Sequence, residues 1–290
     1  MNVSIGVILF NPDKNVLQRV EKYSEISNDV ILYDNSEEIN LVSQELSRSY
    51  DNYISNGRNN GLSEAIKFFF EKASDLGSDL LLTMDQDSDF SNSEIIKMIK
   101  LIEEENDEDY ILYCPNYRKV YLDGSNSKVL GPSKIKNTEN KSTDFAMTSG
   151  SFFKMKFKNE FFPISNLFIG YVDHEICFNI LRNKKKIKMI GDIIFNQEVG
   201  TLVKTTSYNK FFHIVRHSSI RYQYMIRNNL YLEKNFFSDK SIQKKLKKDR
   251  LRLMANIILG EKNKIAKLRS YMNGYKDFSN EKFGKIDVGE

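Results

Sequence analysis

The chain contains little of what builds disulfide frameworks or cysteine-based metal sites. Its 290 residues include two cysteines, three histidines and no tryptophan. Cys114 and Cys177 lie in apolar stretches and lack the spacing of metal ligands. We therefore predict that both are buried free thiols in a reducing cytosol.

Long hydrophobic runs are also missing. No apolar stretch approaches the roughly 18 residues that span a bilayer, and we expect no signal peptide, because the first residues lack a basic segment and a cleavage site. The hydrophobic fraction of 40% and the charged fraction of 28% are typical of globular proteins. We predict a cytoplasmic protein of one large domain, or of one and a half.

Acidic and basic residues are distributed unevenly along the chain. Residues 1–200 carry 23 lysines and arginines against 31 acidic residues, whereas residues 201–290 carry 20 against 8. A basic C-terminal part can bind nucleic acid or the anionic leaflet of a membrane. It can equally be a solvated helical surface, and charge alone does not separate these interpretations.

The first half of the sequence alternates between strand and helix patterns. Asn11 is the predicted N-cap of the first helix, and Pro12 its first residue. Such alternation predicts βαβ units and a parallel sheet. Apolar runs typical of buried strands occur at residues 3–9, 30–33, 52–54 and 80–84, and helical spacing occurs at residues 12–23, 62–73 and 92–105.

The pattern changes in the second half. We predict an α/β domain over residues 1–206, in which residues 1–115 resemble a nucleotide-binding half, and a basic helical region over residues 207–290 that packs on or beside it. Strands are predicted at residues 110–114, 117–122, 128–130, 143–148, 187–190 and 193–199, and helices at residues 172–181 and from about residue 207 to about residue 275.

Two carboxylates follow the apolar run at residues 80–84, in the motif Asp85-Gln86-Asp87. In open α/β sheets, ligands bind beyond the carboxyl ends of the strands. Paired carboxylates there can hold Mg²⁺ or Mn²⁺ together with substrate phosphates. The alternative is a solvated acidic turn, but the position at the end of a buried strand favours the metal site.

Other polar residues follow the neighbouring strands. Asn11 ends the first strand, Asp34 ends the second, and Asn60 and Gly61 open the helix after the third. Asp34 can accept hydrogen bonds from a base or a ribose, and the helix start offers amide groups and close backbone approach. Each of these residues alone is equally a turn residue. Their shared edge of the sheet favours a nucleotide site.

These segments, in this order, resemble family 2 glycosyltransferases, and within that family the bacterial rhamnosyltransferase-like branch. The resemblance covers roughly residues 3–230, and its specificity comes from the ordered set of motifs rather than from any one of them. The matching segments are residues 3–11, 33–36, 59–65, 82–88, 148–151, 171–177 and 217–228.

The resemblance implies a GT-A fold, in which a Rossmann-like, mostly parallel sheet holds Mg²⁺ or Mn²⁺ between the Asp-X-Asp motif and the donor diphosphate. It implies that Asp34 contacts the nucleoside, that Asp87 binds the metal, and that Asp85 contacts the ribose or the metal. The half over residues 116–206 would bind the acceptor. The predicted donor contacts are Asn11, Asp34, Asn60, Gly61, Asp85, Gln86 and Arg221, and the predicted metal ligands are Asp87, Asp85 and Gln197.

Asp173 is the implied catalytic base, because it matches the aspartate of the family's Asp-X-Glu motif. A carboxylate can take the proton of an attacking sugar hydroxyl, while a metal neutralises the leaving diphosphate. Without the resemblance, Asp173 is equally explained as a first-turn acid stabilised by the helix dipole. Glu175 can orient the acceptor or pair with a cation. The predicted acceptor contacts are Ser149, Gly150, His174 and Glu175.

Two positions depart from the family pattern. Relatives often carry an acid where this chain has Gly170, so any acceptor contact made there is absent. They also often place a metal-binding histidine where this chain has Gln197. A glutamine oxygen coordinates a hard cation less strongly than a charged ligand does, so Glu198 and His213 are alternative ligands.

The sequence thus predicts a metal-dependent, inverting glycosyltransferase. By resemblance it moves L-rhamnose from dTDP-rhamnose to a saccharide or lipid-linked saccharide in bacterial surface polysaccharide synthesis. UDP-linked galactofuranose, galactose or glucose are the alternative donors. The acceptor, the linkage and the oligomeric state stay open.

Two other classes of protein are alternatives. A nucleotidyltransferase would need a glycine-rich basic loop after the first strand, which residues 10–13 do not supply. A non-catalytic protein that binds a nucleotide sugar or nucleic acid would explain the basic tail, but Asp173 and Glu175 would then have no function. We therefore predict no nucleic-acid partner.

Basic residues of the C-terminal region suggest a further anion site. Arg221 and Arg227, with His217, can line a pocket for a diphosphate, since arginine makes bidentate phosphate contacts. For Arg216 a solvated helix face is the preferred interpretation.

The predicted tail helices combine an apolar stripe with a basic cluster. The stripe, which by default packs onto the domain, consists of Leu246, Leu251, Met254, Ile257 and Ile258. The alternative is peripheral attachment to the inner face of the cell membrane. In that case the residues that face anionic lipid are Lys244, Lys245, Lys247 and Lys248.

Overall fold

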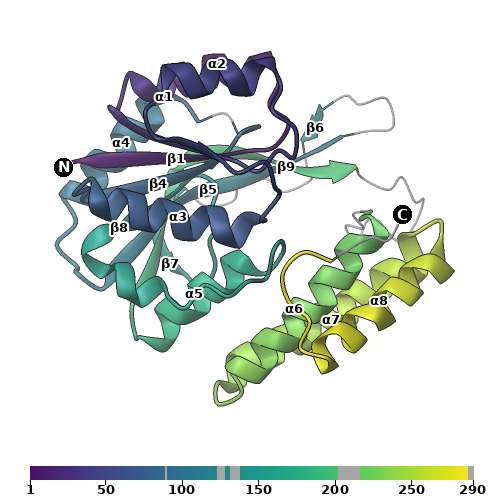
Figure 1. Ribbon diagram of the computed structural model, residues 1–290. Helices are drawn as coiled ribbons and strands as arrows, with labels where there is room; N and C mark the ends of the chain where they lie inside the picture. Colours follow the sequence, from purple (N-terminus) through teal and green to yellow (C-terminus); the bar gives the residue numbers. More distant parts are fainter. Residues whose placement is uncertain (89, 123–127, 131–137, 202–215, 287–290) are drawn as a thin grey trace.

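The structure is a computed structural model, and it describes residues 1–88, 90–122, 128–130, 138–201 and 216–286. Within them, a layered α/β body carries a group of C-terminal helices against one side (Figure 1). The strands are β1 (Val3–Leu9), β2 (Asp29–Asp34), β3 (Tyr53–Ser55), β4 (Leu80–Asp85), β5 (Tyr110–Leu122), β6 (Lys128–Leu130), β7 (Lys141–Thr143), β8 (Ser151–Lys154) and β9 (Lys186–Thr201). They form one sheet in the order β3-β2-β1-β4-β8-β5-β9-β7, with β6 paired to β5.

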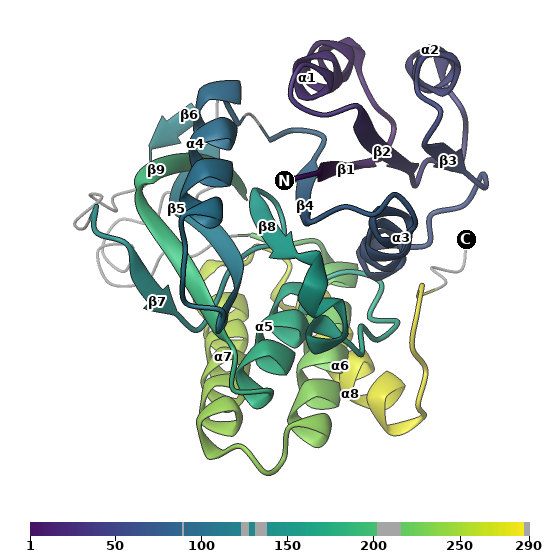
Figure 2. The same ribbon diagram turned by 90° about the vertical axis from the view of Figure 1, so that its left-hand side faces the viewer.

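Helices cover both faces of this sheet (Figure 2). They are α1 (Lys14–Ser24), α2 (Leu41–Ser49), α3 (Leu62–Asp75), α4 (Asn92–Glu103) and α5 (Val172–Arg182), with a short 3-10 helix η1 (Met155–Phe161). Val20, Leu46 and Met98 of α1, α2 and α4 pack into one core, whereas Phe69 and Ile176 of α3 and α5 pack into the other. Strands β1 to β4 are parallel, as the βαβ pattern predicted.

The second half of the sheet is more continuous than the sequence pattern predicted. The strands predicted at residues 110–114 and 117–122 are the single strand β5, and those predicted at 187–190 and 193–199 are the single strand β9. The two strands pair in parallel with a register shift directly after Pro115. Proline cannot donate to a strand ladder, which explains why the pattern is interrupted there.

The strand predicted at residues 143–148 is wrong. β7 ends at Thr143, and the next strand, β8, begins only at Ser151 and lies antiparallel between β4 and β5. Between them Gly150 adopts a positive φ of 79°, which turns the chain into β8. The four residues of β8 are too few to show a period, and the pattern also does not predict α2.

The predicted cap of the first helix is also wrong. α1 begins at Lys14, and its N-cap is Asp13, whose carboxylate accepts the backbone N–H of Asn15 at 2.9 Å. Asn11 instead has a positive φ of 46°, and its backbone N–H donates to the hydroxyl of Ser36 at 2.6 Å. Asn11 therefore belongs to the turn that links the ends of β1 and β2.

Three helices, α6 (Ser219–Asn235), α7 (Lys240–Gly260) and α8 (Lys264–Ser279), form the C-terminal group. The predicted stripe is only partly correct: Leu246 and Ile257 are buried, but Leu251 is 73% exposed and Ile258 is 50% exposed. Lys245, one of the lysines that the membrane alternative turns toward lipid, is partly buried, and its ammonium group lies over the ring of Phe145. Among the described residues, no helix is both long and apolar enough to cross a membrane.

Arg227 fastens the helical group to the α/β body. Its side chain is 1% exposed, and its guanidinium donates to the carbonyls of Leu167, Lys282 and Gly284 at 3.0 to 3.3 Å. Asn228 adds a bond to the carbonyl of Leu167 at 2.9 Å. The guanidinium that the sequence suggested for a diphosphate pocket is thus bonded to backbone carbonyls inside the protein.

We expect Arg227→Ala to lower the free energy of unfolding by about 2–4 kcal/mol, because buried carbonyl groups lose their donors. Urea denaturation followed by circular dichroism measures this change. Arg252→Ala is the control, since Arg252 is exposed on α7, and it should change stability by less than about 0.5 kcal/mol. An equally small effect of Arg227→Ala would contradict the fastening role.

Candidate active site

The strand register brings the predicted polar residues to one edge of the sheet. Asp85 lies opposite Ile8 in the pairing of β4 with β1, and Asp34 lies opposite Leu9 in the pairing of β2 with β1. Ser55 ends β3 at the same level as Asp34. The carboxyl ends of β1 to β4 therefore meet, as the sequence predicted.

Three carboxylates and one guanidinium converge at the end of β4. Burial raises the pKa of Asp85 to about 7, and the negative charges of Asp87 and Asp173 add to this, whereas Arg221 opposes it. Burial likewise raises the pKa of Asp173, which the charge of Arg221 also opposes. Arg221 lies in the first turn of α6 and is solvent-accessible. The structure thus brings residues from β4, α5 and α6 into one site, which we call the acidic cluster.

The turn before β8 holds the acidic cluster in place. The hydroxyl of Ser149 accepts the backbone N–H of Asp85 at 3.1 Å and lies 2.8 Å from the hydroxyl of Ser88. The backbone N–H of Thr148 donates to Oδ1 of Asp173 at 2.9 Å. Gly150 donates its backbone N–H to the carbonyl of Thr83 at 2.8 Å. Ser149 and Gly150, predicted as acceptor contacts, therefore border the cluster and fix the backbone around it.

Gln86 ties the Asp-X-Asp motif to the end of β1. Its side-chain oxygen accepts the backbone N–H of Phe10 at 2.8 Å, and its side-chain nitrogen donates to the carbonyl of Phe10 at 2.9 Å. Arg19 of α1 donates to the carbonyl of Gln86 at 2.9 Å. The side chain predicted to contact the donor is thus engaged with backbone, and it positions the carboxylates on either side of it.

Asp34 is fully buried and bonded within the protein. Its carboxylate accepts the backbone N–H of Ser36 at 2.8 Å, the hydroxyl of Ser43 at 2.6 Å and the hydroxyl of Tyr53 at 2.8 Å. A carboxylate has about four acceptor positions, so three of them are occupied here. The contact of Asp34 with a nucleoside stays a prediction, and the structure gives it the role of fixing the end of β2.

The start of α3 is held against β2 and the loop after Pro163. Asn35, which the sequence analysis missed, accepts the backbone N–H of Asn60 at 3.0 Å and donates to the carbonyl of Gly61 at 3.3 Å. Gly61 has a positive φ of 84°, and a Cβ atom there would lie 2.4 Å from the carbonyl oxygen of Phe168. Asn60 and Gly61 therefore lie at the predicted edge, and Gly61 is required by packing whether or not a ligand binds.

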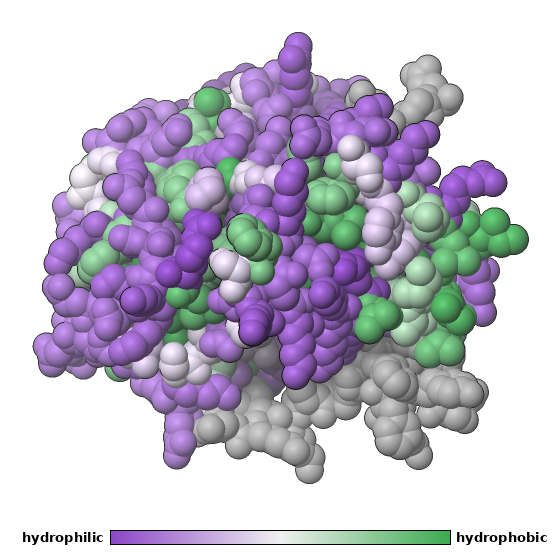
Figure 3. Space-filling model, turned by 90° about the horizontal axis from the view of Figure 1, so that it is seen from below, coloured by the Kyte–Doolittle hydropathy of each residue, from purple (hydrophilic) through white to green (hydrophobic). Residues whose placement is uncertain are grey.

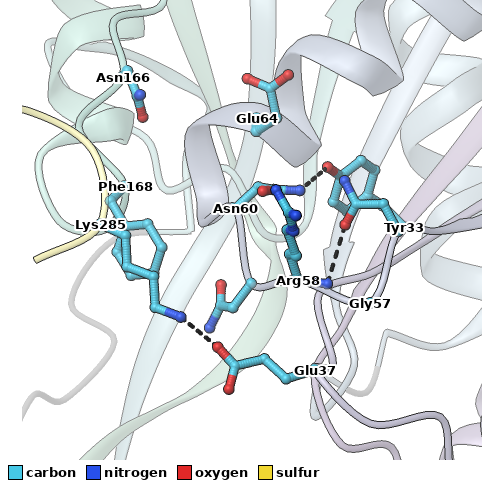
Figure 4. Close-up of a pocket in the computed structure, with 11 residues that line it drawn as sticks. Tyr33, Glu37, Gly57, Arg58, Asn60, Glu64, Asn166, Phe168 and Lys285 are labelled. Carbon is cyan, nitrogen blue, oxygen red and sulfur yellow. Dashed lines mark hydrogen bonds and ion pairs between the residues drawn. The ribbon is translucent and has the colours of Figure 1, made fainter. Parts of the chain in front are cut away.

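A cavity of about 540 Å³ lies beside this helix start (Figure 4). The side-chain nitrogen of Asn60 donates to the hydroxyl of Tyr33 at 3.2 Å within it, and an ion pair between Glu37 and Lys285 lies across one side. The acidic cluster is not part of its wall. The cavity is lined by Tyr33, Glu37, Asn56, Gly57, Arg58, Asn59, Asn60, Glu64, Asn166, Phe168 and Lys285.

Only Asp173 of the predicted Asp173-His174-Glu175 group faces the acidic cluster. His174 packs between aromatic rings, 4.5 Å from that of Phe145, and burial together with the charge of Lys245 lowers its pKa to about 3, so it is neutral. Glu175 is 1% exposed and accepts the backbone N–H and the hydroxyl of Ser165. Acceptor contacts by His174 and Glu175 stay predictions.

The cluster has the donor chemistry of a magnesium or manganese site. Carboxylate oxygens are the ligands that these hard cations prefer, and substrate phosphates commonly complete the coordination. Burial is the main cause of the raised pKa of Asp85, and the negative charges of Asp87 and Asp173, which a cation would neutralise, add to it. The described part of the chain contains no group of three or more histidine, cysteine or acidic residues that could bind a metal by themselves. The residues therefore fit a cation that is shared with a phosphorylated substrate.

For the predicted third ligand, Gln197, the structure describes the backbone alone. Gln197 pairs with Lys119 in the register of β9 with β5, but its side chain and that of Glu198 are outside the described residues. His213 lies outside them entirely. The two cysteines, in contrast, are free and buried, as predicted.

Comparison with known proteins supports a sugar-transferring class. No protein-family model matches this chain. The chain is 26% identical over 248 residues, covering 81% of both proteins, to a protein described as dTDP-rhamnosyl transferase RfbF from Shigella flexneri. It is similar in structure to GalNAc-T7, solved with UDP, GalNAc and Mn²⁺, at a TM-score of 0.59 and 15% identity over 97% of this chain and 56% of that one.

A second solved structure, residues 1–349 of S. aureus TarS, matches with a TM-score of 0.50 and 14% identity over 100% of this chain and 95% of that one. The chain spans about half of the GalNAc-T7 structure and nearly all of the TarS structure. At such low identity these likenesses concern the fold alone. The chain has the GT-A fold with a C-terminal helical region, as the sequence predicted.

Two glycines near the cavity offer a matched test of the packing at the start of α3. Both Gly57 and Gly61 have positive φ, but only at Gly61 would a Cβ atom meet other atoms within 4 Å. We expect Gly57→Ala to lower the free energy of unfolding by about 1 kcal/mol through backbone strain alone. Gly61→Ala should cost at least about 2 kcal/mol more, because Phe168 must move. Equal effects in thermal or urea denaturation would show that the contact with Phe168 is not tight.

Proposed function

We propose that this chain is a metal-dependent, inverting glycosyltransferase that moves a sugar from a nucleotide diphosphate donor to a saccharide acceptor. The observation that carries the proposal is the convergence of Asp85, Asp87, Asp173 and Arg221 at the carboxyl edge of the sheet. Carboxylates suit a divalent cation, and a guanidinium suits a phosphate. Both are needed where a diphosphate leaves.

Asp173 is the proposed catalytic base. Its Oδ1 atom accepts the backbone N–H of Thr148, which fixes the carboxylate in the cluster where it would accept the proton of an acceptor hydroxyl. Burial raises its pKa, and a higher pKa makes the carboxylate a stronger base. The acceptor oxygen would give its proton to Asp173 while it attacks the anomeric carbon from the side opposite the diphosphate. This single displacement inverts the configuration and needs no enzyme nucleophile.

Arg221 and the Asp-X-Asp motif would hold the leaving group. A cation bound by Asp87 and Asp85 supplies positive charge to the departing diphosphate when it is present. Arg221 approaches the same place from α6, whose N-cap Ser218 accepts the backbone N–H of Arg221 at 3.3 Å. Bidentate contact between guanidinium and phosphate would orient the donor.

We propose supporting roles for the other predicted residues. Asp34, Gln86 and Glu175 are engaged in hydrogen bonds within the protein, so we propose that they position the site. The proposed donor edge further includes Asn11, Asn60 and Gly61, the proposed acceptor side includes Ser149, Gly150 and His174, and Gln197 is the proposed third metal ligand.

We propose dTDP-L-rhamnose as the donor and bacterial surface polysaccharide as the product. The support is the rhamnosyl transferase of Shigella flexneri, which matches over most of its length. A UDP-sugar is the second candidate, since the GalNAc-T7 structure holds UDP and Mn²⁺ on a similar fold. Thermal-shift measurements with a panel of nucleotide sugars would separate the two, because a ligand that binds only the native state raises its melting temperature.

Asp173→Asn should lower the transfer rate by about 10²–10⁴-fold, because an amide cannot accept the hydroxyl proton. Donor affinity should stay unchanged, since the proposed base does not contact the diphosphate. Transfer assays and calorimetric titration with the donor measure the two effects. Asp192→Asn is the control, because Asp192 lies at the surface and pairs with Lys97. Loss of donor binding in a folded Asp173→Asn variant would contradict the assignment.

Asp87→Asn should weaken donor binding in the presence of Mn²⁺ by about 10–100-fold, the usual effect of disturbing a metal site. Without Mn²⁺, the variant and the wild type should bind the donor equally weakly. Calorimetric titration with dTDP, with and without the metal, measures both values. Full transfer activity of the wild type in excess chelator would contradict the proposed metal dependence.

A further inference from the structure

Helices α7 and α8 expose a group of large apolar side chains. Leu251 is 73% exposed and Ile265 is 80% exposed, and these two are the most exposed of a set that lies on the two helices and beside the turn between them. Figure 3 shows hydrophobic residues gathered at the right-hand edge of the molecule, where these helices lie. We call this set the α7–α8 patch; it consists of Leu251, Ile258, Leu259, Ile265, Leu268 and Met272.

The α7–α8 patch is separate from the faces with which these helices pack. On α8 the patch residues Ile265, Leu268 and Met272 follow one another at three- and four-residue spacing, which places them on one helix face. The buried residues Tyr271 and Gly274 lie on another face of α8. The same holds on α7, where Leu246, Leu253 and Ile257 are buried and Leu251 and Ile258 are not. The patch is therefore a second apolar surface and not an incompletely packed core.

Positive charge surrounds the α7–α8 patch. Residues 240–279 contain twelve lysines and arginines but only three acidic residues. Glu261 is buried and accepts the hydroxyl of Tyr222, Asp277 accepts the side-chain amide of Gln223, and Asp249 is partly buried. The exposed basic residues of the two helices and their turn are Lys240, Lys244, Lys247, Lys248, Arg252, Lys262, Lys264, Arg269 and Lys276.

We propose that the α7–α8 patch docks on a membrane surface that contains anionic lipid. The apolar side chains would enter the boundary between headgroups and acyl chains, while the lysines and arginines bind lipid phosphates. A second copy of this chain is a poorer occupant, because it would bring the same positive charge against the patch. Nucleic acid would satisfy the basic residues but would leave the exposed leucine and isoleucine side chains in water.

Docking there would also orient the site described above. The end of α7 contacts the start of α6, since Arg216 donates to the carbonyl of Gly260 and the backbone N–H of His217 donates to Glu261. Arg221 follows within the first turn of α6. The membrane would therefore bind helices that contact the segment leading to Arg221. The docking proposal itself does not depend on the proposed enzymatic activity.

Co-sedimentation of the full chain with lipid vesicles tests the proposal. We expect binding to vesicles of phosphatidylcholine mixed with phosphatidylglycerol at low salt, and little binding to phosphatidylcholine alone. The double variant Leu251→Ser with Ile265→Ser should lower the partition coefficient at least about tenfold, since it removes two inserted side chains. Leu41→Ser is the matched control, because Leu41 is 81% exposed on α2, away from the patch. Both variants change exposed positions, and melting temperatures verify that they stay folded.

A second variant tests the charge contribution. Lys248→Glu with Arg252→Glu should weaken binding to anionic vesicles while leaving the apolar residues in place. The proposal is overturned if wild type does not bind anionic vesicles at low salt, or if the serine double variant binds as well as wild type. It is also overturned if light scattering finds a dimer that the serine double variant dissociates, because the patch would then bind a second copy.

Discussion

Burial of acidic groups close to one another, at the end of β4, is the constraint on which the rest of the site depends. Burial and the charges of Asp87 and Asp173 raise the pKa of Asp85 to about 7, so holding these groups together costs folding free energy. The fold opposes this cost with backbone anchors on both sides: Ser149 binds the Asp85 amide, and Gln86 binds the backbone of Phe10, directly after β1. The positive charge of Arg221, and that of any bound cation, can then offset the negative charge of carboxylates that are held in fixed positions.

The helix α6 has two tasks in this arrangement. Its first turn directs Arg221 toward the acidic cluster, and its middle, at Arg227 and Asn228, bonds the carbonyl of Leu167. The loop that holds Leu167 continues into α5, which carries Asp173. The C-terminal helices are therefore not an appendage to the sheet, because the same helix that completes the charge balance also fixes the segment leading to the proposed base.

The sequence was informative where one strand or helix by itself determines where a residue lies. Buried parallel strands appear as continuous apolar runs, and the polar residues that follow them mark the edge of the sheet, so β1 to β4 and the positions of Asp34 and Asp85 were predictable. Hydrogen bonds between distant segments were not predictable, because the same polar side chain can bind a ligand or the protein's own backbone. Gln86 and Arg227 are residue types that often bind ligands, but in the structure both bond to backbone groups. The exposure of Leu251 was hidden for the same reason, since an apolar residue on a helix does not reveal which face packs.

The pairing of β4 with β8 has a consequence for how the protein is made. Ribosomes deliver the amino end first, and β1 to β4 can assemble from neighbouring segments of the nascent chain. The partner of β4 on its other side is β8, which is translated only after α4 and the long strand β5. During that interval one strand edge lacks its neighbour, and an open edge invites pairing with other polypeptides. This is the stage of biosynthesis at which shielding by a chaperone would matter most.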